Sequence, residues 1–170
     1  KYMMILLFSL AAMGKDTCMG RHGIYNHCLP QKKIFDQNRQ LALKNKQMML
    51  IEVGATWCVW CISLSKLLKK EIPKNFNSQV RITELALYKG RKRIKETYSL
   101  LKELLKTSKN KIKIDAIPMM ILYNPKTEVS YFINTAPLEK NTETTKGHDT
   151  NKVLDVIKKG LKKIQDKNVL

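Results

Sequence analysis

A Cys-x-x-Cys pair lies between an apolar, strand-like run and a helix-like segment, and this junction restricts the folds available to the chain more than any other feature. Residues 48–53 form a mostly apolar run of strand length, which Gly54 interrupts. Cys58 and Cys61 follow, and the leucines of residues 62–70 then recur at helical spacing. The two thiols are therefore predicted to lie where a buried strand turns into a helix.

This position has chemical consequences for Cys58 and Cys61. The first turn of a helix carries unpaired N–H groups and the positive end of the helix dipole, so a thiolate there has a pKa below the roughly 8.5 of a free cysteine. At i,i+3 spacing the two side chains share one side of the turn and can close a small disulfide. Cys58 is predicted to be the nucleophile and Cys61 the resolving thiol. The alternative is half of a zinc site, which needs a second pair of ligands.

A second informative segment lies further along the chain. In residues 116–123, Ile117-Pro118 precedes an apolar run. Together with segments 50–53 and 55–61, this segment resembles the thioredoxin superfamily, in particular bacterial exported thioredoxin-like proteins with a Trp-Cys-x-x-Cys site. The resemblance implies an α/β, thioredoxin-like fold with a central mixed β-sheet flanked by helices on both faces. It also implies that the Ile117–Pro118 peptide is cis and lies against the cysteine pair.

The same resemblance implies roles for the residues around the cysteines. An acidic residue occupies the place of Glu52 in the family, where a desolvated carboxyl has a raised pKa and can relay the resolving thiol's proton. The alternative for Glu52 is a carboxylate at a strand edge, paired with a lysine. Trp57 is expected to pack around the site, and Trp60 to shape substrate contact. Pro118 is expected to shape the substrate groove, and the main chain of Ile117 to pair with the substrate.

The rest of the domain alternates between strand-like and helix-like patterns, and this order implies a mixed sheet with helices on both faces. Pro30 fits a helix start, and Pro73 is expected to end the helix after the cysteines. The expected ranges are 31–46, 91–106 and 153–164 for helices, 80–88, 119–123 and 129–133 for strands, and 134–150 for a polar loop.

The first 14 residues combine a basic residue, an apolar run and small residues before Gly14. This pattern is typical of a secretory signal peptide, and an uncleaved anchor or a buried helix is the alternative. The resulting domain prediction is a signal peptide over 1–14, an N-terminal loop segment over 15–30 and a thioredoxin-like domain over 31–170. Export to the periplasm or another extracytoplasmic compartment would place the protein where disulfides persist.

The N-terminal loop segment contains a second pair of cysteines, Cys18 and Cys28, together with His22 and His27. In an oxidising compartment the cysteines can form a second disulfide. Free or mispaired thiols are the first alternative. A metal site is the second, because all four side chains are zinc-type ligands, although their spacing is not a standard one.

The chain is strongly basic, with a formal net charge of +18 and its densest cationic cluster at residues 89–93. Such a charge favours anionic partners, and the alternative is a solvated, lysine-rich surface. The aromatic residues are scattered and the chain contains no recognisable nucleic-acid motif, so no nucleic-acid partner is expected. The solvated surface is the preferred interpretation, and an anionic surface that binds residues 89–93 is the partner that stays open.

These patterns predict a thiol–disulfide oxidoreductase that exchanges disulfides with exported protein substrates through Cys58 and Cys61. A membrane protein is expected as its redox partner, and neither an organic cofactor nor a metal is expected. The direction of exchange stays open, because it depends on the redox potential of the pair. Two alternatives stay open as well: a non-catalytic thioredoxin-fold module that binds an anionic partner, and a metal chaperone that uses the same two thiols.

Overall fold

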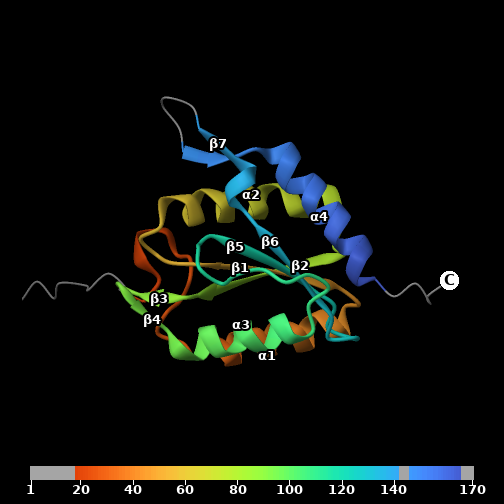
Figure 1. Cartoon of the computed structure of the whole chain (residues 1–170), viewed down its shortest axis with the longest axis horizontal. Coiled ribbons are helices and arrows are strands. Elements are labelled where there is room, and N and C mark those ends of the chain that lie inside the picture. The colour runs from red at the N-terminus through yellow and green to blue at the C-terminus, as the bar shows by residue number, and fades with distance from the viewer. Residues whose placement is uncertain (1–17, 142–145, 166–170) are drawn as a thin grey trace, which may run out of the picture.

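A mixed four-stranded β-sheet lies at the centre of the computed structural model, which describes residues 18–141 and 146–165 (Figure 1). Its strands are β1 (Met48–Gly54), β2 (Val80–Ala86), β5 (Met119–Tyr123) and β6 (Ser130–Asn134). The spatial order is β2-β1-β5-β6, in which β1 and β2 are parallel and the other neighbours pair antiparallel. β1 is therefore an inner strand, hydrogen-bonded on both sides.

In the described residues, four α-helices cover the two faces of this sheet. They are α1 (Gln31–Lys44), α2 (Val59–Phe76), α3 (Lys95–Lys106) and α4 (Thr150–Ile164). In Figure 1, α1 and α3 lie below the sheet, and α2 and α4 lie above it. This three-layer arrangement confirms the predicted α/β fold with a central mixed sheet and helices on both faces, and it is consistent with a thioredoxin-like fold. The predicted signal peptide over 1–14 lies outside the described residues.

The core is divided between the two faces of β1 because successive side chains of a strand point to opposite sides. Ile51 and its neighbours on one face pack with residues of α1 and α3, whereas Leu50 on the other face packs with residues of α2 and α4. By the same alternation, Glu52 points to the side of α2 and α4. An acidic group in this position must be accommodated within an apolar layer.

α2 continues past Pro73, so the expectation that this proline ends the helix after the cysteines is wrong. A proline inside a helix removes one backbone hydrogen bond and costs roughly 3 kcal/mol. Pro73 itself is exposed, but Ile72 and Phe76 on either side are buried against the core. Their packing keeps the last turn helical, and the helix ends at Phe76, followed by the C-cap residue Asn77 with a left-handed φ of 39°.

A small hairpin occupies the start of the segment that the pattern predicts as a helix from residue 91. β3 (Tyr88–Lys89) and β4 (Lys92–Arg93) pair antiparallel on either side of Gly90, and the helix begins only at Lys95. Gly90 has a φ of 56°, a left-handed conformation that glycine adopts without steric cost. The turn therefore interrupts the helical pattern, and the predicted strand over 80–88 ends at Ala86.

The segment predicted as a polar loop, 134–150, also contains regular structure. A short 3-10 helix (Ala136–Leu138) leads into β7 (Glu139–Asn141), which pairs antiparallel with β8 (Lys146–His148). Leu138 and His148 are buried, which anchors this hairpin beside α2. Because most residues of the segment are polar, the sequence pattern did not indicate that these two side chains are buried.

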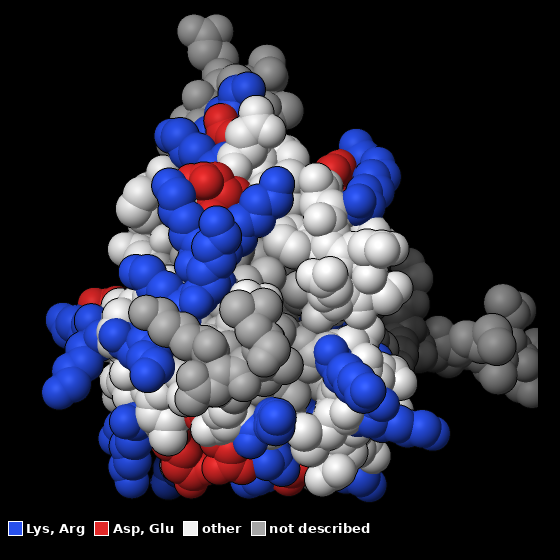
Figure 2. All heavy atoms as spheres, turned by 90° about the vertical axis from the view of Figure 1, so that its right-hand side faces the viewer, with Lys and Arg blue, Asp and Glu red and all other residues white. Residues whose placement is uncertain are grey.

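Cationic side chains are distributed widely over the surface. Figure 2 shows the face at which α4 ends, where Lys and Arg are dispersed among carboxylates and uncharged groups. On this face, the dispersed distribution fits a solvated surface better than a binding patch, whereas β3 and β4 lie on the opposite side of the molecule (Figure 1). None of the helices in the described ranges is both long enough and apolar enough to cross a bilayer.

Candidate active site

Cys58 and Cys61 are joined by a disulfide at the point where β1 passes into α2, as their spacing predicts. Cys58 is the N-cap residue of α2, and its Sγ accepts a hydrogen bond from the backbone N–H of Cys61 at 3.2 Å. Cys58 is 7% exposed, whereas Cys61 is 0% exposed. The helix terminus would thus stabilise a thiolate on Cys58, which is the more exposed residue of the pair.

Glu52 is completely buried on β1, and its two carboxyl oxygens have different environments. Oε1 accepts a hydrogen bond from the Tyr25 hydroxyl at 2.5 Å, while Oε2 has no hydrogen-bond partner among the described residues. Burial raises the pKa of Glu52 to about 8, and the hydrogen bond from Tyr25 lowers it. A carboxyl group with this pKa exchanges its proton near neutral pH, and Oε2 is the atom free to do so.

The neighbouring carboxylate, Glu84 on β2, has the partners that Glu52 lacks. The two residues stand side by side in the register of β1 and β2. Glu84 accepts a hydrogen bond from the Ser65 hydroxyl and forms a 2.7 Å ion pair with Lys69. The lysine of this region therefore pairs with Glu84. Because Glu52 lies on an inner strand, the alternative of a strand-edge carboxylate paired with a lysine is wrong.

Tyr25 is the functional-site residue that sequence reasoning missed. Its ring is buried, and its hydroxyl donates to Glu52 and also lies 3.4 Å from the carbonyl oxygen of Cys61. Burial and the charge of Glu52 raise the pKa of Tyr25, so the hydroxyl stays protonated and acts as a donor. Tyr25 lies between Cys18 and Cys28 in the chain, and these flanking cysteines were the only local signal that the loop is fixed.

The loop that presents Tyr25 is closed by a disulfide between Cys18 and Cys28, the first of the three alternatives that the sequence left open. Gln31 ties the loop to the sheet. Its side-chain N–H groups donate to the carbonyls of Asn26 and Leu29 at 2.7 Å, and its Oε1 accepts from the backbone N–H of Ala86 at 2.7 Å. The N-terminal loop segment is thereby attached to the end of β2, close to the active site.

Gly54 provides the space in which these groups meet. A Cβ atom at this position would lie 2.5 Å from Cζ of Tyr25 and 2.9 Å from Cβ of Cys61. Contacts this short exclude a side chain unless its neighbours move. The glycine that interrupts the apolar run therefore allows Tyr25 to approach Glu52 and Cys61 closely.

The two tryptophans lie in different environments. Trp57 is 53% exposed, and its indole N–H donates to the carbonyl of Gly90 at 2.6 Å. Trp60 is half-buried and packs edge-on against His148 of β8, with ring centroids 5.8 Å apart. Trp57, which the resemblance places in a packing role, is thus the more accessible of the two, and each tryptophan contacts one of the hairpins that the sequence pattern did not predict.

The Ile117–Pro118 peptide is cis, as the resemblance implies. Ile117 packs against the cluster that contains Cys58 and Cys61. Pro118 is buried, and its carbonyl accepts a hydrogen bond from the Thr135 hydroxyl at 2.6 Å. Direct contact between Pro118 and the two sulfurs stays a prediction.

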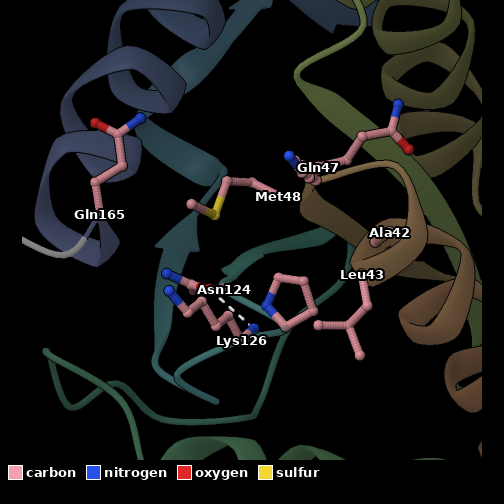
Figure 3. A pocket seen from close by; sticks show the side chains of 9 residues that line it. Ala42, Leu43, Gln47, Met48, Asn124, Lys126 and Gln165 are labelled. Carbon is pink, nitrogen blue, oxygen red and sulfur yellow. Dashed lines mark hydrogen bonds between the residues drawn. The ribbon is translucent and has the colours of Figure 1, made fainter. Parts of the chain in front are cut away.

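A cavity of about 750 Å³ lies at the opposite end of the sheet, between the start of β1 and the end of α4 (Figure 3). Met48, Asn124 and Gln165 border it, and its ionisable lining residues, Lys46 and Lys126, are both cations. No thiol or carboxylate lines this cavity, so the cavity does not take part in thiol chemistry. Within residues 18–141 and 146–165, no group of three or more His, Cys, Asp or Glu side chains comes together as a metal site.

The chain is similar in structure to a protein of known structure. No protein-family model and no curated protein matches the chain. Among solved structures, a disulphide isomerase from Xylella fastidiosa Temecula1 is similar, with a TM-score of 0.48 and 15% identity over 64% of this chain and 76% of that chain. The chemistry of the site is therefore inferred from its own residues. A thioredoxin-like fold with a Trp57-Cys58-x-x-Cys61 sequence at the start of α2 makes this end of the sheet the candidate thiol–disulfide exchange site.

Proposed function

We propose that the protein is a thiol–disulfide oxidoreductase that exchanges disulfides with exported protein substrates through Cys58 and Cys61. The observation that carries the proposal is the position of the Cys58 sulfur at the N-cap of α2, where it accepts the N–H of Cys61. The same N–H would stabilise a Cys58 thiolate, which is the nucleophile that exchange requires.

In the reducing direction, the Cys58 thiolate attacks one sulfur of a substrate disulfide. A Cys58–substrate disulfide forms, and the first substrate sulfur leaves as a thiolate. Cys61 then attacks the Cys58 sulfur, closes the Cys58–Cys61 disulfide and releases the second substrate thiolate. Two electrons pass from the protein dithiol to the substrate. The oxidising direction is the same sequence in reverse, and the redox potential of the pair decides between them.

Glu52 serves this reaction as a proton relay for Cys61, whose buried thiol must lose a proton before it attacks. In its ionised form, the carboxylate takes that proton on Oε2, the oxygen without a hydrogen-bond partner in the described part of the chain. Tyr25 is a positioning residue, because its hydrogen bond holds Oε1. A pKa near 8 lets the same carboxyl both accept and return a proton near neutral pH.

Export and a membrane redox partner belong to the same proposal. The signal-peptide pattern of residues 1–14 supports export, as does the second disulfide, because structural disulfides persist in oxidising compartments. A pair that acts as a reductase outside the cytoplasm needs electrons delivered across the membrane, which is the task of the expected partner. Trp57, Trp60, Ile117 and Pro118 form the expected substrate-binding surface around Cys58.

The experiment is the reduction of insulin disulfides by dithiothreitol, followed by turbidity, for the wild type and for Cys58→Ser. The wild type should accelerate precipitation, and the variant should return it to the rate without protein. A Cys18→Ser/Cys28→Ser variant is the matched control, since it removes two other sulfurs and should still catalyse exchange. Full activity of Cys58→Ser would refute the proposal and favour the alternative of a non-catalytic binding module.

A further inference from the structure

The hairpin formed by β3 and β4 carries the densest group of exposed cations next to the active site. Lys89, Arg91, Lys92 and Arg93 are all exposed, and none of them forms an ion pair with a carboxylate in the described residues. Other cations of the chain do have such partners, for example Arg39 with Glu128 at 2.5 Å. The hairpin therefore presents positive charge that the protein itself does not neutralise.

This hairpin has a defined structure and is attached to the core. Arg93 stacks on Tyr98, with its guanidinium carbon 4.8 Å from the ring centroid, and it lies 5.9 Å from the ring centroid of Tyr88. The backbone N–H of Ile94 donates to the carbonyl of Leu87 at 2.8 Å, which closes the base of the hairpin. These contacts fix the position of the hairpin, and therefore of its cationic side chains, relative to the core.

Trp57 connects the hairpin directly to the nucleophile. This residue precedes Cys58 in the chain, its indole N–H donates to Gly90 at the hairpin turn, and its ring centroid lies 5.9 Å from that of Tyr88. Trp57 and Val59, on either side of Cys58, are 53% and 59% exposed. An apolar platform around Cys58 therefore continues into a cationic surface.

We propose that Trp57, Val59 and the hairpin (88–93) form a docking surface for protein substrates whose reactive cysteines are flanked by acidic residues. This inference rests on the proposed thiol–disulfide exchange. Unneutralised cations attract an acidic segment over about a Debye length, roughly 8–10 Å at moderate salt, and raise the rate of encounter. The hydrogen bond between Trp57 and Gly90 holds the hairpin next to the residue that precedes Cys58, so a segment attracted to the hairpin comes close to the sulfur.

A protein segment fits this surface better than a membrane does. A segment of substrate chain can lie along the hairpin while its disulfide reaches Cys58, and its apolar side chains can contact Trp57 and Val59. An anionic bilayer has the complementary charge, but it offers no sulfur to the nucleophile that the hairpin adjoins. The two occupants also predict different experimental results.

The test uses three short synthetic peptides with the same internal disulfide and with acidic, neutral amide or basic flanking residues. The second-order rate constant for exchange is measured at low and high salt for the reduced wild type and for Lys89→Ser/Arg91→Ser/Lys92→Ser. Arg93 is kept because of its stacking on Tyr98. The matched control is Lys109→Ser/Lys158→Ser/Lys162→Ser, which removes the same charge from exposed positions away from the hairpin.

At low salt, the wild type should react about tenfold faster with the acidic peptide than with the neutral one, and salt should reduce this preference. The hairpin variant should lose the preference while its rate with the neutral peptide stays unchanged. The control variant should keep the preference. An unchanged preference in the hairpin variant, or an equal loss in the control, would overturn the inference.

The neutral peptide separates this inference from the proposed function. If the wild type exchanges the neutral peptide but shows no charge preference, the docking surface is refuted and the oxidoreductase stands. If no peptide reacts, both are refuted. Sedimentation with vesicles of three parts phosphatidylcholine and one part phosphatidylserine tests the other occupant. Binding that depends on the hairpin, without a peptide preference, would assign this surface to membranes and overturn the inference.

Discussion

The two disulfides of this protein have the same span but occupy very different sites. Each joins cysteines whose Cα atoms are 5.2 Å apart, with a sequence separation of 3 for Cys58–Cys61 and of 10 for Cys18–Cys28. Cys58 caps a helix and its sulfur accepts a backbone N–H, whereas Cys28 is exposed in a loop ahead of α1. The surrounding hydrogen-bond donors and the burial, rather than the span of the bond, therefore distinguish the two disulfides.

The second disulfide still contributes to the site, because it closes the loop that carries Tyr25. The Tyr25 hydroxyl reaches across 27 residues of sequence to Glu52, beside the reactive pair. In the proposed mechanism, one disulfide supplies the reacting sulfurs, and the other helps to position Tyr25, which holds the carboxyl that relays the proton of Cys61. Four variants test this division of roles.

The largest effect is expected from Cys61→Ser, which removes the resolving sulfur and leaves the nucleophile. Turnover should fall to the uncatalysed rate, because the Cys58–substrate disulfide can no longer be resolved within the protein. The trapped adduct should be visible by non-reducing electrophoresis and mass spectrometry after mixing with a disulfide peptide. Cys28→Ser in a Cys18→Ser background is the control and should trap no adduct. A turnover of Cys61→Ser equal to the wild type would contradict the two-cysteine mechanism.

Opening the other disulfide should act mainly on stability. The Cys18→Ser/Cys28→Ser variant should lose about 2–4 kcal/mol of unfolding free energy, because the unfolded chain regains the freedom of the closed loop. Urea denaturation of the oxidised wild type and the variant measures this difference. Exchange activity should fall much less than in Cys61→Ser. Complete loss of activity in a folded double variant would mean that both disulfides take part in the chemistry.

Glu52→Gln should reduce the rate of the resolving step by about 100-fold, as expected for the loss of a general base. In the wild type this rate should rise with pH through the pKa of Glu52, which is about 8, and the variant should lack that rise. Stopped-flow kinetics of the Cys58–peptide adduct between pH 6 and pH 9.5 measures both effects, with Glu103→Gln on the exposed side of α3 as the control. A pH profile in Glu52→Gln identical to that of the wild type would exclude the relay.

The same carboxyl predicts how stability depends on pH. Burial raises the pKa of Glu52 from its ordinary value of 4.5 to about 8, so between these values the folded state holds a proton that the unfolded state releases. The contribution of Glu52 to the unfolding free energy should therefore be fully present below about pH 4.5 and be lost as the pH rises through 8. Urea titrations at several pH values should show this decline in the wild type and a smaller one in Glu52→Gln.

The smallest effect is expected from Tyr25→Phe, which keeps the ring and removes the hydroxyl. The loss of a hydrogen bond to a buried carboxyl should cost about 1–3 kcal/mol of unfolding free energy. Because this hydrogen bond lowers the pKa of Glu52, its removal should also move the pH profile of the resolving step to higher pH. Tyr131→Phe, whose hydroxyl contacts a surface lysine, serves as the control. An unchanged profile in Tyr25→Phe would show that the hydroxyl does not act on Glu52.

Local sequence patterns were sufficient for the elements that meet at the reactive pair. The apolar run of β1, the helical spacing after Cys61 and the Cys-x-x-Cys spacing depend on neighbours within a few residues, so they can be read along the chain. The resemblance added the cis Ile117–Pro118 peptide and pointed to Glu52. The three-layer arrangement then followed from the order of strands and helices along the chain, as a central sheet with helices on both faces.

Only the tertiary structure decided which distant groups complete the site. Tyr25 belongs to a loop whose composition predicts exposure, yet it is buried against Glu52 because Gly54 leaves room and Gln31 anchors the loop. The helix continues past Pro73 because buried neighbours on the same turn hold it in place. The spacing of apolar residues along a helix or strand indicates which side of that element faces the core. It carries no information on which remote residue occupies the facing position, and here that residue determines the environment of the buried carboxyl.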